Sequence, residues 1–219
     1  MGLLNHRSLV LVTLLSLLWQ SDVQSVEAAK IQKAWETRVE RFRKTSTISK
    51  DYIAKEFEIL GELLRSTPAG VIDSELERLI HSDKAYDQMS AYEEKFIDFH
   101  IDKYETEGNW DKMVYILGNK CPRNVGYVSL ELGITNGKKP ENLSVLFDSY
   151  DKATDQQSKQ RLLSVLSSVF ADLRKQYAND LEFLAASRRW LLANQATLKI
   201  NTAYSPFAMD SQRRKFFVH

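Results

Sequence analysis

The residues best suited to do chemistry lie in the stretch EEKFIDFHIDKYE, which contains Asp98, His100 and Asp102. Carboxylate and imidazole groups bind divalent metals and transfer protons. Metal ligands on one helix need a spacing of three or four residues, which places them on the same face. Asp98 and Asp102 have that spacing, but His100 lies roughly 200° away from Asp98 around the helix. The spacing therefore predicts a charged and aromatic helix surface, without a three-ligand metal site.

A second acid and imidazole pair is formed by Glu77 and His81, which are also four residues apart. One such pair on a helix is usually a surface hydrogen bond. Di-iron helical bundles need Glu-x-x-His, but Ile97 stands where that glutamate would precede His100. Neither pattern predicts a metal centre.

The common motifs of catalytic and nucleotide-binding sites are missing from the sequence. It contains no G-x-S-x-G, no P-loop, no G-x-G-x-x-G and no H-E-x-x-H. We therefore expect no catalytic residue, no cofactor and no bound metal, and favour a non-catalytic function. An enzyme stays open as an alternative, with carboxylates from distant helices converging on His81 or His100.

Cys121 is the single cysteine, so an internal disulfide bond cannot form. This excludes a small extracellular domain held together by disulfides. Cys121 precedes Pro122 at an expected helix end, and no histidine is near it in the sequence. We expect a buried, small apolar side chain there in preference to a reactive thiol.

The first residues, MGLLNHRSLVLVTLLSLLWQSDVQS, have the layout of a secretory signal peptide: a basic start, an apolar run and a polar end. Val23 and Ser25 are small enough for cleavage after Ser25, and Ala28 offers a second choice. The alternatives are an uncleaved anchor and a buried first helix. We expect a signal peptide at 1–25 and a secreted or periplasmic protein without a transmembrane span.

The net charge of +1 predicts no broad surface for nucleic acids. The signal peptide would remove Arg7 and Asp22, one charge of each sign, so this balance does not change. Asn142-Leu143-Ser144 matches the N-glycosylation sequon, which would matter only in a eukaryotic host. The charge therefore argues against nucleic acid as a partner.

Only 8 glycines and 4 prolines interrupt the chain, and apolar residues recur at helical spacing almost throughout. This pattern predicts about nine helices, around 31–42, 53–64, 71–80, 86–104, 110–117, 128–134, 143–150, 162–177 and 181–192. Short loops predict antiparallel helical hairpins. We expect an all-α domain at 26–196 and a C-terminal tail at 197–219 that docks or is partly disordered.

The segment 128–134 is ambiguous, because Val128, Leu130, Leu132 and Ile134 alternate as in a strand and a possible Asn-Gly hairpin turn follows. The residues after Pro140 read better as a helix, so we favour helix, loop, helix over a strand pair.

Three helix starts have recognisable capping residues. Thr67 before Pro68 resembles an N-cap followed by proline at the first helical position. Thr154 with Gln157 matches a capping box, and Asn179 is suited to cap the last helix.

The stretches LGNKCPRN, around Leu117, and TDQQSKQRLLSVLSSVF resemble pieces of HEAT-type helical repeats over about 110–177. The resemblance implies a curved α-solenoid, and the alternative fold is an irregular helical bundle. HEAT-type arrays bind partners and perform no catalysis, so it supplies no catalytic residues.

We therefore expect a secreted helical scaffold that binds a protein or another extracellular partner. Candidate partner-binding residues are the aromatics of the helical domain and the basic and aromatic residues of the tail: Trp110, Tyr115, Tyr127, Arg213, Arg214, Phe216 and Phe217. The alternative is a helical carrier with an internal apolar pocket for a small ligand, lined by the Phe and Tyr side chains between 86 and 104.

Overall fold

The computed structural model describes residues 6–45, 52–120, 126–200 and 217–218. Within them the fold is all-α, as the helical spacing of the apolar residues predicted. The α-helices in chain order are α1 (His6–Thr45), α2 (Tyr52–Arg65), α3 (Ala69–Ile80), α4 (Ala91–Thr106), α5 (Trp110–Lys120), α6 (Gly126–Gly137), α7 (Ser144–Lys152), α8 (Gln156–Val169), α9 (Ala171–Gln176) and α10 (Asp180–Asn194).

Two short 3-10 helices, η1 (Tyr86–Gln88) and η2 (Pro140–Leu143), lie between these elements. In the tail, β1 (Leu198–Lys199) pairs antiparallel with β2 (Phe217–Val218), with Leu198 opposite Val218. No helix in the described ranges is long and apolar enough to cross a membrane.

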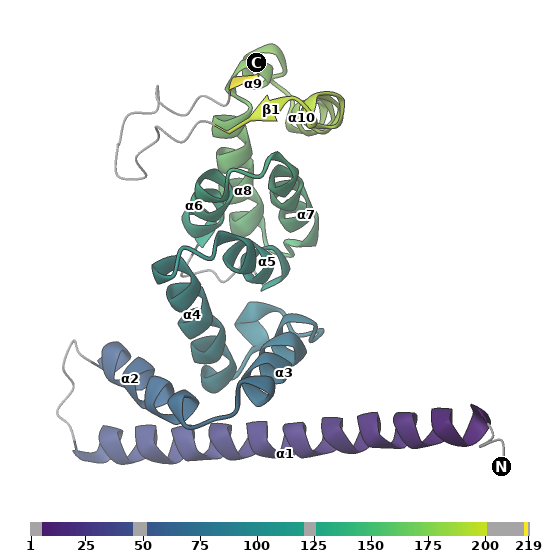
Figure 1. The fold of residues 1–219 in the computed structure, drawn as a ribbon. Helices are drawn as coiled ribbons and strands as arrows, with labels where there is room; N and C mark the ends of the chain where they lie inside the picture. Colours follow the sequence, from purple (N-terminus) through teal and green to yellow (C-terminus); the bar gives the residue numbers. More distant parts are fainter. Residues whose placement is uncertain (1–5, 46–51, 121–125, 201–216, 219) are drawn as a thin grey trace. The chain divides into compact units, whose positions relative to one another are not determined.

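The chain divides into two units, 1–83 with 89–99 and 84–88 with 100–219. In the first unit, α1 packs on α2 and α3 (Figure 1). The buried stripe of α1 is Ala28, Ile31, Trp35 and Val39, at steps that repeat along one helix face. The indole Nε1 of Trp35 donates a 3.1 Å hydrogen bond to the carbonyl of Glu56, so this stripe also fixes α2.

In the second unit, α5 packs on α6 and α7 packs on α8, while α5 also contacts α7 and α6 also contacts α8 (Figure 1). α10 then packs on α7 and α9. The pair α5 and α6 therefore packs on the pair α7 and α8, and Leu117, Leu130, Leu146 and Leu162 of these four helices are buried.

The ambiguous segment 128–134 is helical, because it lies inside α6. Tyr127, Leu130 and Ile134 are all buried, at the three- and four-residue steps that place side chains on one helix face. A strand would have placed Leu130 and Leu132 on the same face, whereas Leu132 is only partly buried.

Glycine allows α5 to approach both of its neighbours closely. A Cβ atom added to Gly118 would lie 2.5 Å from Cγ1 of Val145 on α7. One added to Gly133 of α6 would lie 2.8 Å from Cγ2 of Val114. Both helix pairs therefore depend on the missing side chain.

Two of the capping predictions are wrong by a residue or more. The Thr67 hydroxyl donates to the carbonyl of Leu63, at the end of α2, and does not cap α3. The cap of α8 is Asp155, whose carboxylate accepts from the backbone N–H of Ser158, and not Thr154. The third prediction is confirmed, since Asn179 accepts from the N–H groups of Leu181 and Glu182.

The helix predicted over 162–177 is interrupted in the structure. α8 ends at Val169, and Phe170 has the non-helical dihedrals φ −106° and ψ 46° before α9 begins. The Phe170 ring contacts those of Phe147 and Trp190, with centroids 5.6 and 5.9 Å away. The apolar stripe continues past Phe170 on the same spacing, so the pattern does not reveal the break.

Candidate binding pocket

A pocket of about 120 Å³ lies within the second unit. The last turns of α5 and α7, the first turn of α8 and the segment 84–87 form its wall. Most of the residues in the wall have polar or charged side chains. The wall carries three lysines, Lys84, Lys120 and Lys152, and two aspartates, Asp87 and Asp155.

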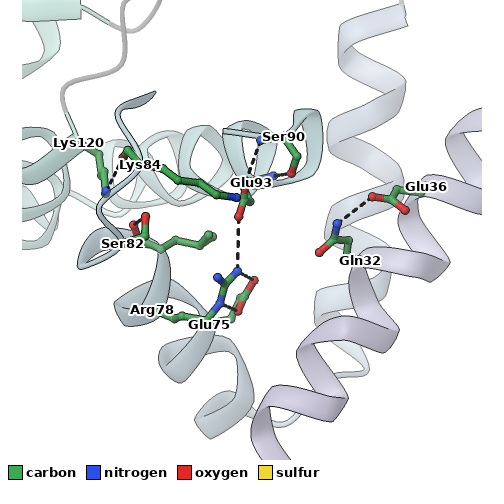
Figure 2. A network of polar contacts seen from close by, with 10 residues as sticks. Gln32, Glu36, Glu75, Arg78, Ser82, Lys84, Ser90, Glu93 and Lys120 are labelled. Atoms are coloured by element: carbon green, nitrogen blue, oxygen red, sulfur yellow. Dashed lines mark hydrogen bonds and ion pairs between the residues drawn. The ribbon is translucent and has the colours of Figure 1, made fainter. Parts of the chain in front are cut away.

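Lys120, the last residue of α5, is 7% exposed. Its Nζ donates a 2.9 Å hydrogen bond to the backbone carbonyl of Lys84 (Figure 2). A buried ammonium needs such partners because leaving water is costly. The bond also holds the segment 84–87 against the end of α5, so it builds part of the wall.

Ser149, in α7, is 3% exposed and lines the pocket. Its Oγ is one of four buried side-chain polar atoms that have no hydrogen-bond partner in the described ranges. Of the four residues, Ser149 alone lines the pocket. The backbone carbonyl of Ser149, in contrast, accepts a hydrogen bond from the N–H of Ala153 at the end of α7. A buried hydroxyl without a partner costs about 1–3 kcal/mol.

Asp155 is committed to the start of α8. One of its carboxylate oxygens accepts from the N–H of Ser158 at 2.8 Å, and the other accepts from the Ser158 hydroxyl at 2.6 Å. At the exposed rim, Lys152 Nζ lies 3.5 Å from Oδ1 of Asn119. The pocket therefore combines a rigid wall of helix ends with one lysine inside and two on the exposed side.

The aromatic residues proposed as partner contacts lie elsewhere in the second unit. Tyr127 is 5% exposed and belongs to the core, Trp110 is half-buried at the start of α5, and Tyr115 is 41% exposed. None of the three lines the pocket. Arg213, Arg214 and Phe216, and also Cys121, lie outside the described residues. Phe217 belongs to β2, opposite Lys199.

The histidines form no metal centre within the described residues, where no three metal-binding side chains come together. His100 is buried and its ring centroid lies 6.1 Å from that of Tyr104, whereas Asp102 on the same helix is exposed. His81 and Glu77 form the predicted surface contact, with 3.3 Å between Nε2 and Oε2.

The first unit contains a network of charged side chains, shown in Figure 2, in which Glu75 and Glu93 are buried and Arg78 is half-exposed. Arg78 binds Glu75 through two hydrogen bonds of 2.7 and 2.9 Å, and its Nη2 lies 3.8 Å from Glu93. Glu93 Oε2 accepts from the N–H of Ser90, whose hydroxyl accepts from the N–H of Glu93. The hydrogen bond to Glu75 raises the pKa of Arg78 above its ordinary value. This network ties α3 to the start of α4.

Sequence reasoning missed both the pocket and this network. Part of the network could have been predicted from the sequence, because Ser90 and Glu93 match the S-x-x-E capping box. The pocket had only weak signals, namely a lysine in the last turn of α5 and of α7 and an Asp-x-x-Ser start of α8. Its residues come from four separate segments, and no local pattern brings them together.

Comparison of the chain with models of protein families, with curated proteins and with solved structures found no match.

Proposed function

We propose that the chain is a non-catalytic helical scaffold that binds another protein, and that the pocket of the second unit is a point of contact. The observation that carries the proposal is the Ser149 hydroxyl, which is buried in the wall of a lysine-rich pocket without a partner among the described residues. The hydroxyl is closed off from solvent, so a group that enters the pocket from a partner would supply the missing hydrogen bond once the Ser149 side chain turns toward it, and would then offset the cost of its burial.

The size of the pocket favours a protein partner over a carried small molecule. Pockets that enclose a drug-sized ligand have volumes of roughly 300–1,000 Å³. The volume of about 120 Å³ is well below that range, so the pocket takes a small group that projects from a larger molecule. The aromatic residues that the carrier alternative assigned to a cavity are packed, with Tyr92 and Phe96 both buried and their ring centroids 5.7 Å apart.

We also propose that the second unit is a short HEAT-like array of helical hairpins. The contacts of α5 with α7, and of α6 with α8, support this interpretation. In helical-repeat proteins each hairpin packs only on its neighbours, and the resulting surface binds partners. A scaffold of this kind needs no catalytic residue.

Secretion is part of the proposal. The N-terminal pattern supports cleavage after Ser25, and the buried residues Ala28, Ile31, Trp35 and Val39 of α1 all lie beyond that position. N-terminal sequencing of the protein from its host would find Val26 first. A protein that retains Met1 would overturn the proposed cleavage.

The proposed binding is tested by site-specific photo-crosslinking in the host organism. A photoreactive amino acid replaces Lys152 at the exposed rim of the full chain. We expect a discrete crosslinked protein that mass spectrometry identifies. The matched control position is Lys175, an exposed lysine of α9 in the same unit that does not line the pocket.

The crosslink should disappear when Ser149→Ala is added, because the pocket then lacks its buried hydroxyl. The proposal is overturned if Lys152 yields no crosslink, or yields the same products as Lys175. It is equally overturned if the product at Lys152 is unaffected by both Ser149→Ala and Lys120→Met.

A further inference from the structure

We infer that the pocket recognises a carboxylate, presented by an acidic side chain or by the C-terminus of a polypeptide. The inference rests on the proposed function, because it names the group that the partner inserts. Three properties of the pocket lead to it: its volume, its charge and the hydrogen-bond donors in its wall.

The volume admits a small group. The volume of about 120 Å³ lies well below the roughly 300–1,000 Å³ of sites that enclose a drug-sized ligand. A carboxylate with the methylene that carries it is a group of suitable size.

The charge favours a single negative charge. Three lysines and two aspartates in the wall leave a formal charge of +1. Helices α5 and α7 contribute their C-terminal ends, which carry partial negative charge, and α8 contributes its N-terminal end, which carries partial positive charge. Together these helix ends reduce the positive charge of the wall, which therefore suits a single negative charge better than the roughly −1.5 to −2 of a phosphate group.

The donors match a carboxylate, which accepts hydrogen bonds at both oxygens. Lys120 Nζ is held inside the wall by its bond to the carbonyl of Lys84. Lys84 and Lys152 are exposed, so their long side chains can fold over a group that enters. Ser149 adds a neutral O–H that lacks an acceptor in the described ranges and reaches an entering group when its side chain turns toward the pocket. Hydrogen bonds between ammonium groups and carboxylates are among the stronger ones in proteins.

A purely structural explanation accounts for part of this arrangement. Lys120 and Lys152 lie in the last turns of α5 and α7, where cations stabilise the helix ends. That explanation accounts for the two lysines, but it explains neither the presence of the pocket nor the lack of a hydrogen-bond partner for the Ser149 hydroxyl. The two explanations differ in one measurable respect, since only the carboxylate site loses ligand affinity when the Ser149 hydroxyl is removed.

The test is a titration of the ¹⁵N-labelled full chain, followed by the backbone amide signals of Asn119, Ser149 and Ala153. The probes are N-acetylglutamate N-methylamide, which carries a side-chain carboxylate, and N-acetylglycine, which carries a C-terminal one. N-Acetylglutamine N-methylamide is the neutral isostere, and inorganic phosphate is the dianion. We expect saturable shifts with the carboxylates, and at least tenfold weaker binding of the neutral probe and of phosphate. The carboxylate that saturates at the lower concentration identifies the source.

Ser149→Ala should weaken carboxylate binding about tenfold without lowering the melting temperature. Lys120→Met should abolish it, while Lys175→Met, which removes the same charge from α9, should leave it unchanged. Lys120→Met also removes a bond that builds the wall, so Ser149→Ala is the deciding variant. The inference is overturned by equal binding of the neutral isostere, by tighter binding of phosphate, by the absence of saturable shifts, or by unchanged affinity of Ser149→Ala.

The two experiments separate the two claims. A crosslinked partner without carboxylate binding leaves the proposed function in place and removes the carboxylate. Carboxylate binding without a crosslinked protein keeps the assigned ligand group but overturns the protein scaffold, and indicates a carrier of small acids.

Discussion

Lys120 Nζ donates a 2.9 Å hydrogen bond to the backbone carbonyl of Lys84, a residue 36 positions earlier in the chain. The bond joins the end of α5 to the segment 84–87, where Gln88 N–H in turn donates to the carbonyl of Ala85. Because both ends of the bond line the pocket, it links the stability of the second unit to the shape of the site.

Lys120→Met keeps most of the apolar stem of the side chain but removes the donor. We expect the free energy of unfolding to fall by about 1.5–3 kcal/mol, the range for a hydrogen bond to a charged group. Amide hydrogen exchange over 85–88 should also become faster, since this segment loses its anchor. Denaturant unfolding and exchange mass spectrometry measure the two effects. Unchanged exchange over 85–88 would show that other contacts hold the wall.

Gly118→Ala tests the close approach of α5 and α7. The new methyl group would lie 2.5 Å from Cγ1 of Val145, which is too close without movement. We expect a loss of about 1–3 kcal/mol in the free energy of unfolding, as for other overpacked cores. Adding Val145→Ala should restore part of this loss, because it removes the clashing atom. The double-mutant cycle, measured by urea unfolding, gives the coupling.

The matched control for this substitution is Gly70→Ala in α3, where the nearest atom to the new methyl group is 3.9 Å away. Replacing a helical glycine by alanine where there is such space stabilises the protein by roughly 0.4–1 kcal/mol. A similar loss for both variants would mean that the close approach to Val145 is not the cause.

The local helices could be predicted because they follow from a pattern within one segment. Ile31, Trp35 and Val39 recur at four-residue steps, and all three are buried on α1. At 128–134 the strand-like alternation of apolar residues was a weaker predictor than helical spacing, because the buried residues Leu130 and Ile134 are four positions apart. In each case, burial of a helical stripe decided the local structure.

The pocket could not be predicted in the same way. Gly118, Ser149 and Ser158 lie on three different helices, and their proximity depends on how α5, α7 and α8 stack. The break at Phe170 depends likewise on rings that come from α7 and α10. Stacking between hairpins leaves no periodic signal in a single segment, so side chains that meet through it appear only in the structure.

Asp155→Ala and Thr154→Ala together test which residue caps α8. Asp155 accepts two hydrogen bonds at the helix start, so its replacement should lower the free energy of unfolding by about 0.5–2 kcal/mol. Thr154→Ala should change it by less than about 0.5 kcal/mol, as is usual at exposed positions away from such contacts. Thermal and urea unfolding of both variants measure the difference. The opposite order would restore the capping box predicted from the sequence.

Glu94→Gln should stabilise the protein at neutral pH. Burial, followed by the negative charge of Asp98, raises the pKa of Glu94 above its ordinary value. A carboxyl with a higher pKa in the folded state destabilises folding at pH above that pKa, and this penalty is lost as the pH falls below the unfolded value. We expect an increase of a few tenths of a kcal/mol at pH 7, because the group is partly exposed. The difference between variant and parent should vanish below about pH 4. A difference that is independent of pH would exclude this cause.

Tyr92→Phe should not destabilise the first unit, although Tyr92 is 1% exposed and its ring lies 5.9 Å from that of Trp35. The hydroxyl has no hydrogen-bond partner in the described ranges, so phenylalanine keeps the ring contacts and removes a buried polar group without a partner. We expect the free energy of unfolding at pH 7 to be unchanged or higher by about 1 kcal/mol.

The advantage of Tyr92→Phe should grow in alkali, because burial raises the pKa of the Tyr92 phenol above its ordinary value. The folded state then holds the phenolic proton more tightly than the unfolded state does. The parent protein therefore loses stability as the pH rises above about 10, the ordinary pKa of tyrosine. Phenylalanine has no proton to lose, so urea unfolding at neutral and alkaline pH should show the two stabilities diverging. A loss of more than about 1 kcal/mol at pH 7 would instead mean that the hydroxyl makes a hydrogen bond that the variant breaks.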